Sequence, residues 1–523
     1  MLYNLEWLQS GQVFPPNCEK PRLVRYRQNE ALFDGNHFGD PCIRSRDGVE
    51  ELPVELFQKC AARISKVIGN FEDVVSFPTL LNYQRLMSLK MADLVCGEYP
   101  TISGVSPEDN AAIREARDFT CFDDRLYSTV LDISRYGDAI WRLYYDEENV
   151  RDTFTCWTPT QWFPIVAQDG TNTVIQHCLC WRENKKVNDK AKDDWRLHVQ
   201  IHGTRKSEVG KYIQKELKLH DDGHTIKKEL SSKEVPTGLD RCAVFHLKAF
   251  SVTNSVYGYD DYMPIDSIMA EIMARVGQIS GILDKHADPN ITGPVSMLEL
   301  NPETGEYKLN TGKFFAVSPG EEQPKYMTWD GQLTSAFKSL EFLINQLYIL
   351  SEMGAALLGG QDGSGTAISG TAMRFKMVNP LAKARRIANS LTLSVRNLFS
   401  SLCTSTDVPA ARISVFWADG LPDDPRENIE NCKLASGETK LMPLETAIME
   451  FFGRSNEEAS QWIEKIRAET AANVANVRGG DGSNAKNDPN KPGPQDGTGV
   501  NPSKKGSTTG LNDFHGLQNG GSE

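Results

Sequence analysis

Two long helices are the elements that the pattern of apolar and polar positions predicts most directly. Apolar residues recur at three- and four-residue spacings over Asp261–His286 and again over residues 331–357, which places them on one stripe of each helix. Such stripes indicate either a helical hairpin within one domain's core or rods that pack on copies of the same chain. The stripe residues are Ile265, Ile268, Met269, Ile272, Met273, Val276, Ile279 and Ile282 in the first helix, and Leu333, Phe337, Leu340, Ile344, Leu347, Leu350 and Leu357 in the second.

The region before these helices contains one part with a strand-like pattern of apolar residues and another with a helical pattern. From Ala139 to Ala249, short apolar or alternating runs separated by Gly, Asp and Asn predict antiparallel strands. Residues 1–50 give little indication of structure. Between them, helical spacing predicts helices near Val54–Ile68, Leu80–Val95, Pro107–Phe119 and Arg125–Arg135.

The region after the long helices ends in a segment with too few apolar residues to form a core. A strand is expected at Ala411–Trp417, and helical spacing returns over Leu444–Val477. Residues 478–523 then hold 11 glycines and 4 prolines in 46 positions. Such a segment buries too little apolar surface to offset the entropy of ordering it, so we expect a disordered tail. The whole chain is predicted to be α+β, with its helical and strand regions segregated.

Composition narrows the class of protein. The 523 residues carry a net charge of −13, which argues against coating nucleic acid by bulk charge. The 11 cysteines include no CxxC pair and therefore suggest reduced thiols in a cytosolic setting. No signal peptide and no membrane span are expected, since no apolar run approaches eighteen residues.

A glycine-rich loop, Gly359–Gly370, follows the second long helix. It lacks the lysine that a phosphate-binding loop requires after its last glycine. The loop is therefore interpreted as a connector, or as a mobile loop that touches something moving past it.

A basic stretch follows that loop. From Gly363 to Thr406 there is no Asp or Glu, and Pro380 is expected to kink the helix predicted here. The stretch indicates either a positive band near a polyanion or a solvated basic face that also pairs with acidic neighbours. Its cations are Arg374, Lys376, Lys383, Arg385, Arg386 and Arg396.

No catalytic or metal site is predicted, and the chain is not expected to be an enzyme. His177, Cys178 and Cys180 lie on one predicted strand and His198 and His202 on another, but no second cysteine pair has zinc-finger spacing. A G-x-S-x-G nucleophile motif is absent. The acidic pairs Asp123–Asp124 and Asp260–Asp261 are expected near helix starts. No cofactor is expected.

The order of elements resembles the portal proteins of tailed bacteriophages, also called head–tail connectors. The similarity covers most of residues 55–475. An early helix that ends in a Gly-x-x-Pro turn is similar to the family's, as are the ends of the long helices and the segments after them. The matching stretches are Asn82–Pro100, Gly258–Asp266, Leu283–Pro294, Ser369–Ala372 and Val415–Asp424.

The resemblance implies a division of the chain into the family's parts. These are a wing of helices and antiparallel strands, a two-helix stem, a small α/β clip, a tunnel loop, a long kinked helix, a helical crown and the disordered tail. The corresponding residues are 1–255 for the wing, with strand 411–417 returning to it within 407–439, then 256–287 and 331–357 for the stem, 288–330 for the clip, 358–370 for the tunnel loop, 371–406 for the kinked helix, 440–477 for the crown and 478–523 for the tail.

The resemblance also implies a function. The chain would form a ring, usually a homododecamer, at one capsid vertex of a virion assembled in the host cytoplasm, and double-stranded DNA would pass through the ring without sequence specificity. The implied partners are the terminase large subunit, the major capsid protein, the scaffold and the head–tail adaptor or neck proteins, with no membrane partner. The implied DNA-contacting residues of the tunnel loop are Gln361, Ser364, Thr366, Ser369, Arg374 and Lys376.

The clip is where the resemblance places docking of the motor and neck proteins. Val295–Glu299 and Glu306–Leu309 flank the turn-rich Asn301–Gly305, which predicts a hairpin. The implied docking residues are Asn301, Glu303, Glu306 and Lys308. Two alternatives stay open: a structural or scaffold-like oligomer of a virus particle without a channel, and a DNA-packaging enzyme, although the lysine-bearing phosphate loop of such an enzyme is missing.

Overall fold

The computed structural model describes part of the chain, which divides into two compact units, Met1–Ser455 and Asn456–Glu523. The described residues are 1–37, 57, 59, 80–186, 192–253, 255–287, 291–292, 298–300, 307–309, 320, 325–326, 333–359, 375–403, 408–418, 425–437, 441–454 and 456–479. The helix expected at Val54–Ile68 and the tail beyond residue 479 therefore fall almost entirely outside them.

The helices of the first unit confirm several boundaries predicted from sequence. One of them, Pro107–Phe119, begins after a capping box in which Ser106 and Asp109 satisfy each other's backbone N–H groups. The helices are α1 (Lys20–Asp34), α4 (Tyr83–Cys96), α5 (Pro107–Phe119), α6 (Phe122–Tyr136), α7 (Asp266–Ala287), α8 (Leu333–Leu350), α9 (Gly354–Leu357), α11 (Val378–Leu402), α12 (Pro425–Ser436) and α13 (Leu444–Phe452). In the second unit, the described element is α14 (Asn456–Gly479).

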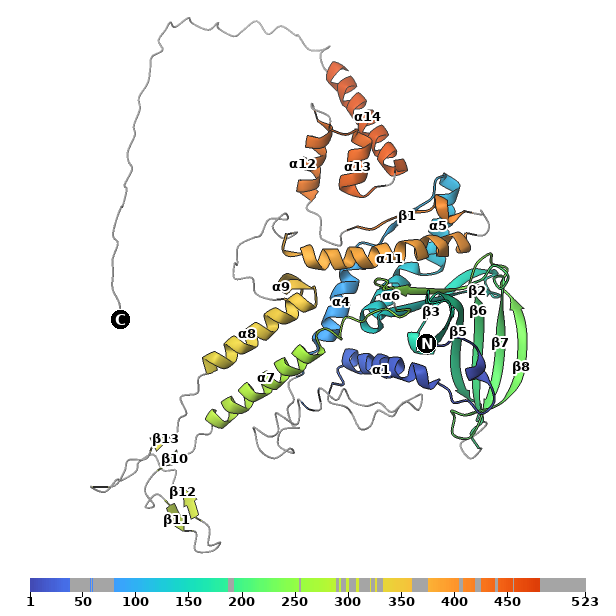
Figure 1. Ribbon diagram of the computed structural model, residues 1–523. Helices are drawn as coiled ribbons and strands as arrows, with labels where there is room; N and C mark the ends of the chain where they lie inside the picture. The colour runs from blue at the N-terminus through green and yellow to red at the C-terminus, as the bar shows by residue number, and fades with distance from the viewer. Residues whose placement is uncertain are drawn as a thin grey trace, which may run out of the picture. The chain divides into compact units, whose positions relative to one another are not determined.

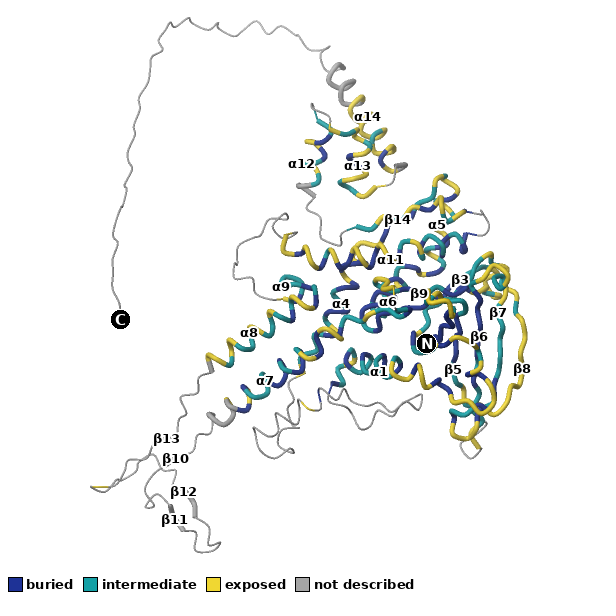
Figure 2. The backbone as a smooth tube through the Cα atoms, viewed as in Figure 1, coloured by how far each residue is buried: buried dark blue, intermediate teal, exposed yellow. Residues whose placement is uncertain are grey.

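Two antiparallel sheets follow α6, as the strand pattern predicts. The smaller has the order β3-β2-β9 and the larger the order β4-β5-β6-β7-β8 (Figure 1). The strands are β2 (Asp138–Asp146), β3 (Arg151–Trp157), β9 (Val244–Lys248), β4 (Trp162–Val166), β5 (Val174–Asn184), β6 (Trp195–Gly203), β7 (Lys211–Leu219) and β8 (Ile226–Pro236). Strands β7 and β8 lie within the predicted strand region Ala139–Ala249, although both are rich in Lys and Glu. Most side chains of β8 are exposed (Figure 2).

Within the described residues of this unit, the buried apolar side chains form three cores. The two sheets meet at Ile140, Trp162 and Leu179, while Cys178 and Cys180 on the opposite face of β5 pack toward the N-terminal segment. Successive strand residues point to opposite faces, so β5 serves both cores. The largest core joins α4, α6, α7 and α11 to the smaller sheet.

The two long helices α7 and α8 lie side by side (Figure 1). The first begins at Asp266 rather than at the expected Asp261, because Asp260 accepts hydrogen bonds from the backbone of Tyr262 and Met263 in a turn, and Pro264 follows that turn. The buried half of its stripe, including Met269 and Met273, packs within the subunit's own core. For the buried half of the stripe, the structure therefore agrees with the alternative of a helical hairpin within one domain's core.

The second long helix is also shorter than the expected 331–357. It ends at Leu350, and Glu352 then adopts a left-handed conformation with φ of 59°, which a helix does not tolerate. Ser351 accepts a hydrogen bond from the Met353 backbone in this turn. The short α9 follows, and its neighbours Met353 and Leu358 are buried in the core.

The helix after the glycine-rich loop is interrupted rather than bent in its middle. Residues 375–376 are helical, Met377 forms a turn and α11 begins at Val378. Pro380 therefore lies in the first turn of α11, where its missing N–H costs no helical hydrogen bond and its ring disfavours continuation of the preceding turn.

Short strands join distant parts of the chain. β14 (Ser414–Phe416), at the expected strand 411–417, pairs with β1 (Thr101–Ser103). The predicted hairpin is confirmed, because β11 (Leu298–Leu300) pairs antiparallel with β12 (Tyr307–Leu309). In addition, β10 (Ile291–Thr292) pairs with β13 (Lys325–Tyr326). The helical block Leu444–Val477 is broken at Gly453, whose φ is 60°, and α12 packs on α13.

Candidate functional site

Most residues of the predicted channel and docking sites lie outside the described part of the chain. These are Gln361, Ser364, Thr366, Ser369, Arg374, Asn301, Glu303 and Glu306. Lys376 is described and exposed in the helical turn just before Met377. Lys308 lies on β12 opposite Glu299.

Lys383 is the clearest departure from the expected basic band. Its side chain is only 8% exposed, and its Nζ lies 2.7 Å from Asp261 Oδ1 and 3.1 Å from the Ser351 carbonyl oxygen. One cation of α11 therefore fixes both the segment before α7 and the turn after α8. A lysine held in this way is a structural group whose charge is used within the subunit.

The carboxylate of Asp261 continues into a chain of hydroxyl groups. Ser134 of α6 donates to Asp261 Oδ2 at 2.7 Å, and its Oγ lies 2.9 Å from Ser88 Oγ. Ser88 of α4 in turn lies 2.8 Å from the Tyr262 hydroxyl. Burial raises the pKa of Tyr262, so its hydroxyl stays protonated and completes the network.

A second ion-pair cluster lies at the same helix start. Arg25 of α1 donates to both carboxylate oxygens of Asp260, at 2.7 and 3.2 Å, and to Asp266 at 2.8 Å. Burial raises the pKa of Asp266, and the Arg25 charge offsets part of that effect. The acidic residues before α7 are thus bound to cations of α1 and α11, a stronger role than the expected interaction with the helix dipole.

The same start is held by a close backbone contact. Gly258 lies against Gly137, the residue that ends α6, and a Cβ added to Gly258 would lie 2.0 Å from the Gly137 carbonyl oxygen. Asp138 accepts a hydrogen bond from the Gly258 N–H at 2.8 Å. Glycine at 258 is therefore required by packing, since any side chain would push the two segments apart.

Two further cations of the acid-free stretch have partners within the subunit. Arg386 lies 2.6 Å from Glu352, with both side chains substantially exposed. Arg396 donates to the carbonyl oxygens of Ala410 and Ala411, which belong to the 3₁₀ turn before β14. The stretch is therefore not a uniform positive band. Pairing with acidic neighbours, the alternative left open by the sequence, holds for Lys383 and Arg386.

Arg385 differs from these three. It is exposed and lines a groove of about 710 Å³ between α4, α11, β14 and the α12–α13 pair. Lys376 and Arg385 are both exposed.

Exposed large apolar side chains on α8 lie both on and off the stripe that the sequence predicts. Phe337 and Leu350, both on the stripe, are 51% and 47% exposed, and Phe342 and Ile349, both off it, are 61% and 62% exposed. Leu347 is fully buried. We call Phe342 and Ile349 the α8 surface, because at 3.6 residues per turn they lie on one face of the helix, whereas Phe337 points in a different direction. The seven-residue spacing of Phe342 and Ile349 could have indicated a second stripe.

The described residues offer no metal site and no membrane span. No group of three or more His, Cys, Asp or Glu side chains in this part of the chain is arranged to hold a metal ion. His177 and His202 are neighbours across β5 and β6, and both are buried. None of the described helices combines the length and apolar character needed to cross a bilayer.

Comparison with known proteins identifies the family. Residues 79–473 match the family described as phage portal protein, SPP1 Gp6-like, and no curated protein matches the sequence. A chain from the virion of a native gene transfer agent particle is 12% identical over 75% of this chain and 92% of its own, with a TM-score of 0.43. A chain from the neck of the empty particle is 13% identical over 70% and 89%, also with 0.43.

A third solved structure, from the neck of the native particle computed with C12 symmetry, is 11% identical over 81% of this chain and 98% of its own, with a TM-score of 0.37. The family match rests on sequence and covers well over half of the 523 residues. The predicted resemblance to head–tail connectors is thereby confirmed. The chain belongs to the SPP1 Gp6-like family of phage portal proteins.

Proposed function

We propose that this chain forms a ring-shaped channel at one capsid vertex, through which double-stranded DNA enters during packaging, is retained and later leaves. The ring would also dock the terminase large subunit and the neck proteins at its clip. Family membership supports a portal, and the α8 surface is the observation that carries the ring. ATP hydrolysis would belong to the docked motor.

The α8 surface is what a ring subunit needs and a monomer does not. Phe342 and Ile349 lie seven residues apart, two turns of helix, so they share a face. Large apolar side chains gathered on one exposed face mark an interaction surface. In a ring, each subunit presents one face to the preceding copy and a different face to the next. The α8 surface would be one of these two faces.

Removing this surface is expected to abolish assembly. The double variant Phe342→Ser, Ile349→Ser should yield folded monomers where the wild-type chain yields rings, because two large apolar contacts, each worth about 1.5–3 kcal/mol when buried, are lost at every interface. Mass photometry and negative-stain imaging give the subunit number and show whether an axial hole exists. Circular dichroism checks the fold.

The matched control replaces two apolar residues elsewhere that are more exposed still, Val105→Ser and Leu434→Ser, at 77% and 74%. This control should still form rings. Rings that survive the α8 double variant would remove α8 from the interface. Closed wild-type particles without a hole would instead favour a structural oligomer without a channel.

Arg374 and Lys376 are proposed to contact the DNA backbone. They follow the loop 358–370 directly and carry charge without an acid nearby in sequence. A conduit requires weak phosphate contacts, since complete neutralisation would hold the DNA and stall its movement. Replacing both with alanine should leave the ring intact and reduce the DNA that is packaged and protected from nuclease.

The charge-matched control is Arg205→Ala, Lys206→Ala, two exposed cations in the loop between β6 and β7. It lowers the net charge equally and should package normally. If both double variants package as the wild type does, Arg374 and Lys376 are not channel residues. If both fail equally, net charge rather than position decides packaging.

A further inference from the structure

One long edge of the larger sheet is open in the described part of the chain. β8 is the last strand in the order of that sheet, so β7 covers one of its edges and no described strand covers the other. The residues from Lys227 to Glu234 are exposed on both faces of the strand (Figure 2). Such a strand presents the remaining backbone N–H and C=O groups to solvent, and these groups can pair with an added strand.

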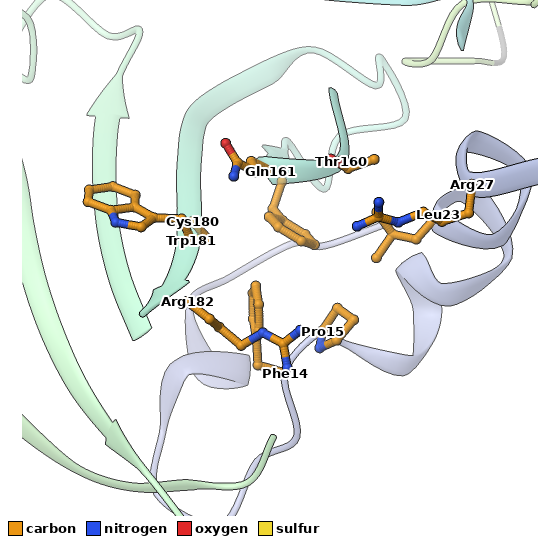
Figure 3. Close-up of a pocket in the computed structure, with 10 residues that line it drawn as sticks. Phe14, Pro15, Leu23, Arg27, Thr160, Gln161, Cys180, Trp181 and Arg182 are labelled. Atoms are coloured by element: carbon orange, nitrogen blue, oxygen red, sulfur yellow. The ribbon is translucent and has the colours of Figure 1, made fainter. Parts of the chain in front are cut away.

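The N-terminal segment already pairs with this edge at one end. The Gly11 N–H donates to the Ile226 carbonyl oxygen and the Ile226 N–H donates to the Gln12 carbonyl oxygen, both at 2.8 Å. Phe14 anchors the segment, because its ring is buried and lies beside Arg182 of β5 (Figure 3). The contact is antiparallel. The start of the edge therefore binds an extended antiparallel segment, and the remainder has the same backbone geometry.

The pairing pattern identifies the backbone groups that stay available. Ile226 points its N–H and C=O away from β7, and outward and inward residues alternate along an antiparallel pair. Followed through the bulges of the β7–β8 register, this alternation turns Glu229, Ser232 and Glu234 outward. Pro236 falls on the next outward position, where the missing N–H costs no bond to β7. The outward N–H and C=O groups of β8 are thus available to a further strand.

The side chains of β8 indicate the chemistry of that strand. Glu229 pairs with Lys215 of β7 at 2.8 Å, and Glu234 pairs with Lys211 at 2.9 Å. Both glutamates of the strand are therefore neutralised within the sheet. Its lysines show no ion pair to any acid that the structure describes: Lys227, Lys228 and Lys233.

These features select one kind of partner. Two copies of β8 paired edge to edge would bring lysines close to lysines, which destabilises a sheet and argues against self-pairing. An extended segment that carries Asp and Glu gains the backbone hydrogen bonds and also places carboxylates near Lys228 and Lys233. We propose that the outer edge of β8 binds such an acidic segment of a partner protein as an added antiparallel strand.

The probe is a short capped peptide that alternates Glu with Thr and Val, and the control peptide has Lys in place of Glu. Each is labelled with a fluorophore and titrated with the full-length protein at low ionic strength, and binding is read from fluorescence anisotropy. Only the acidic peptide should bind. Hydrogen exchange measured by mass spectrometry should slow over residues 227–236 and stay unchanged over β4, the strand at the opposite end of the sheet order.

Two variants separate the backbone contribution from the charge. Ser232→Pro removes an outward donor and keeps the ladder to β7, so it should weaken peptide binding about tenfold. Lys228→Gln, Lys233→Gln keeps the edge and should weaken binding about fivefold. The control Arg114→Gln, Arg412→Gln removes two exposed cations on α5 and in the 3₁₀ turn before β14 and should bind as the wild type does. Circular dichroism checks each fold; if Ser232→Pro misfolds, the lysine variant decides.

Several results would overturn the proposal. These are no binding of the acidic peptide, equal binding of the lysine peptide, slowed exchange outside residues 227–236 alone, and wild-type affinity in a folded β8 variant. Tighter binding of a short DNA duplex than of the acidic peptide would also overturn it, because the lysines of β8 would then contact nucleic acid rather than a protein strand.

Discussion

Replacing Lys383 with methionine is expected to lower the free energy of unfolding of the first unit by about 3 kcal/mol. The change leaves Asp261 without the cation at 2.7 Å and leaves the Ser351 carbonyl oxygen without its donor. Breaking a buried ion pair from one side costs about 3–5 kcal/mol, and the 16% exposure of Asp261 places this pair at the low end. Urea unfolding, followed by tryptophan fluorescence, measures the effect.

The natural control for this variant lies one turn along the same helix. Arg386 pairs with Glu352 at 2.6 Å, but the two side chains are 42% and 47% exposed, so Arg386→Gln should cost at most about 1 kcal/mol. The double variant Lys383→Met, Asp261→Asn should recover part of the loss, because it removes the uncompensated charge. Equal losses of unfolding free energy for Lys383→Met and Arg386→Gln would show that Lys383 does not fix the segment before α7 and the turn after α8.

Elements whose signals are local were predictable from the sequence. Helix α5 matches its expected bounds because Ser106 and Asp109 cap it and Pro107 opens it. The hairpin of β11 and β12 could be predicted because the turn-rich stretch Asn301–Gly305 lies between the two short strand-like runs Val295–Glu299 and Glu306–Leu309. In each case the residues that decide the structure lie within a few positions of each other.

Elements decided by distant residues were not predictable. The ion pairs that hold the segment before α7 in place come from Arg25 and Lys383, which lie far from Asp260 and Asp261 in sequence. Strand β8 is rich in Lys, Glu and Ser and is a strand only because β7 pairs with it along its length. No periodicity in the sequence reports such contacts.

For the candidate site, too, the sequence predicts some features and not others. The sequence identified the six cations of the acid-free stretch, but their roles depend on neighbours from other elements. Lys383 is buried with Asp261, Arg396 holds a backbone turn, and Arg385 faces a groove. A charge pattern gives the sign of a surface, whereas the direction of each side chain is set by the tertiary fold.

Acidification to about pH 5 is expected to destabilise the paired sheets through His177 and His202, by about 2 kcal/mol per histidine. Burial lowers the pKa of each imidazole from 6.5 to about 3. Below about pH 6.5 the unfolded chain binds a proton on each ring and the folded chain does not. The stability that these two neutral rings allow is therefore fully present above about pH 6.5, and it falls as the pH drops toward 3.

The hydrogen bonds explain why the folded protein keeps these rings neutral. Trp162 Nε1 donates to His177 Nδ1 at 3.0 Å, so a proton on Nδ1 would place two donors face to face. His202 is stacked on Tyr212, and its buried Nε2 has no hydrogen-bond acceptor among the described residues. The charge of Arg142 faces His202, and His246 faces His177, and each lowers the pKa further.

Two variants separate these histidines from general acid denaturation. In His177→Asn the side-chain oxygen can accept the Trp162 hydrogen bond without titrating, and in His202→Phe the stacking on Tyr212 is kept. Each variant should lose about 2 kcal/mol less than the wild type between about pH 7.5 and about pH 5, measured by urea unfolding at both pH values. His220→Gln, at an exposed position, should follow the wild type. Parallel losses in all four proteins would mean that neither ring takes up a proton on unfolding, so that burial does not lower the pKa of either histidine in the folded state.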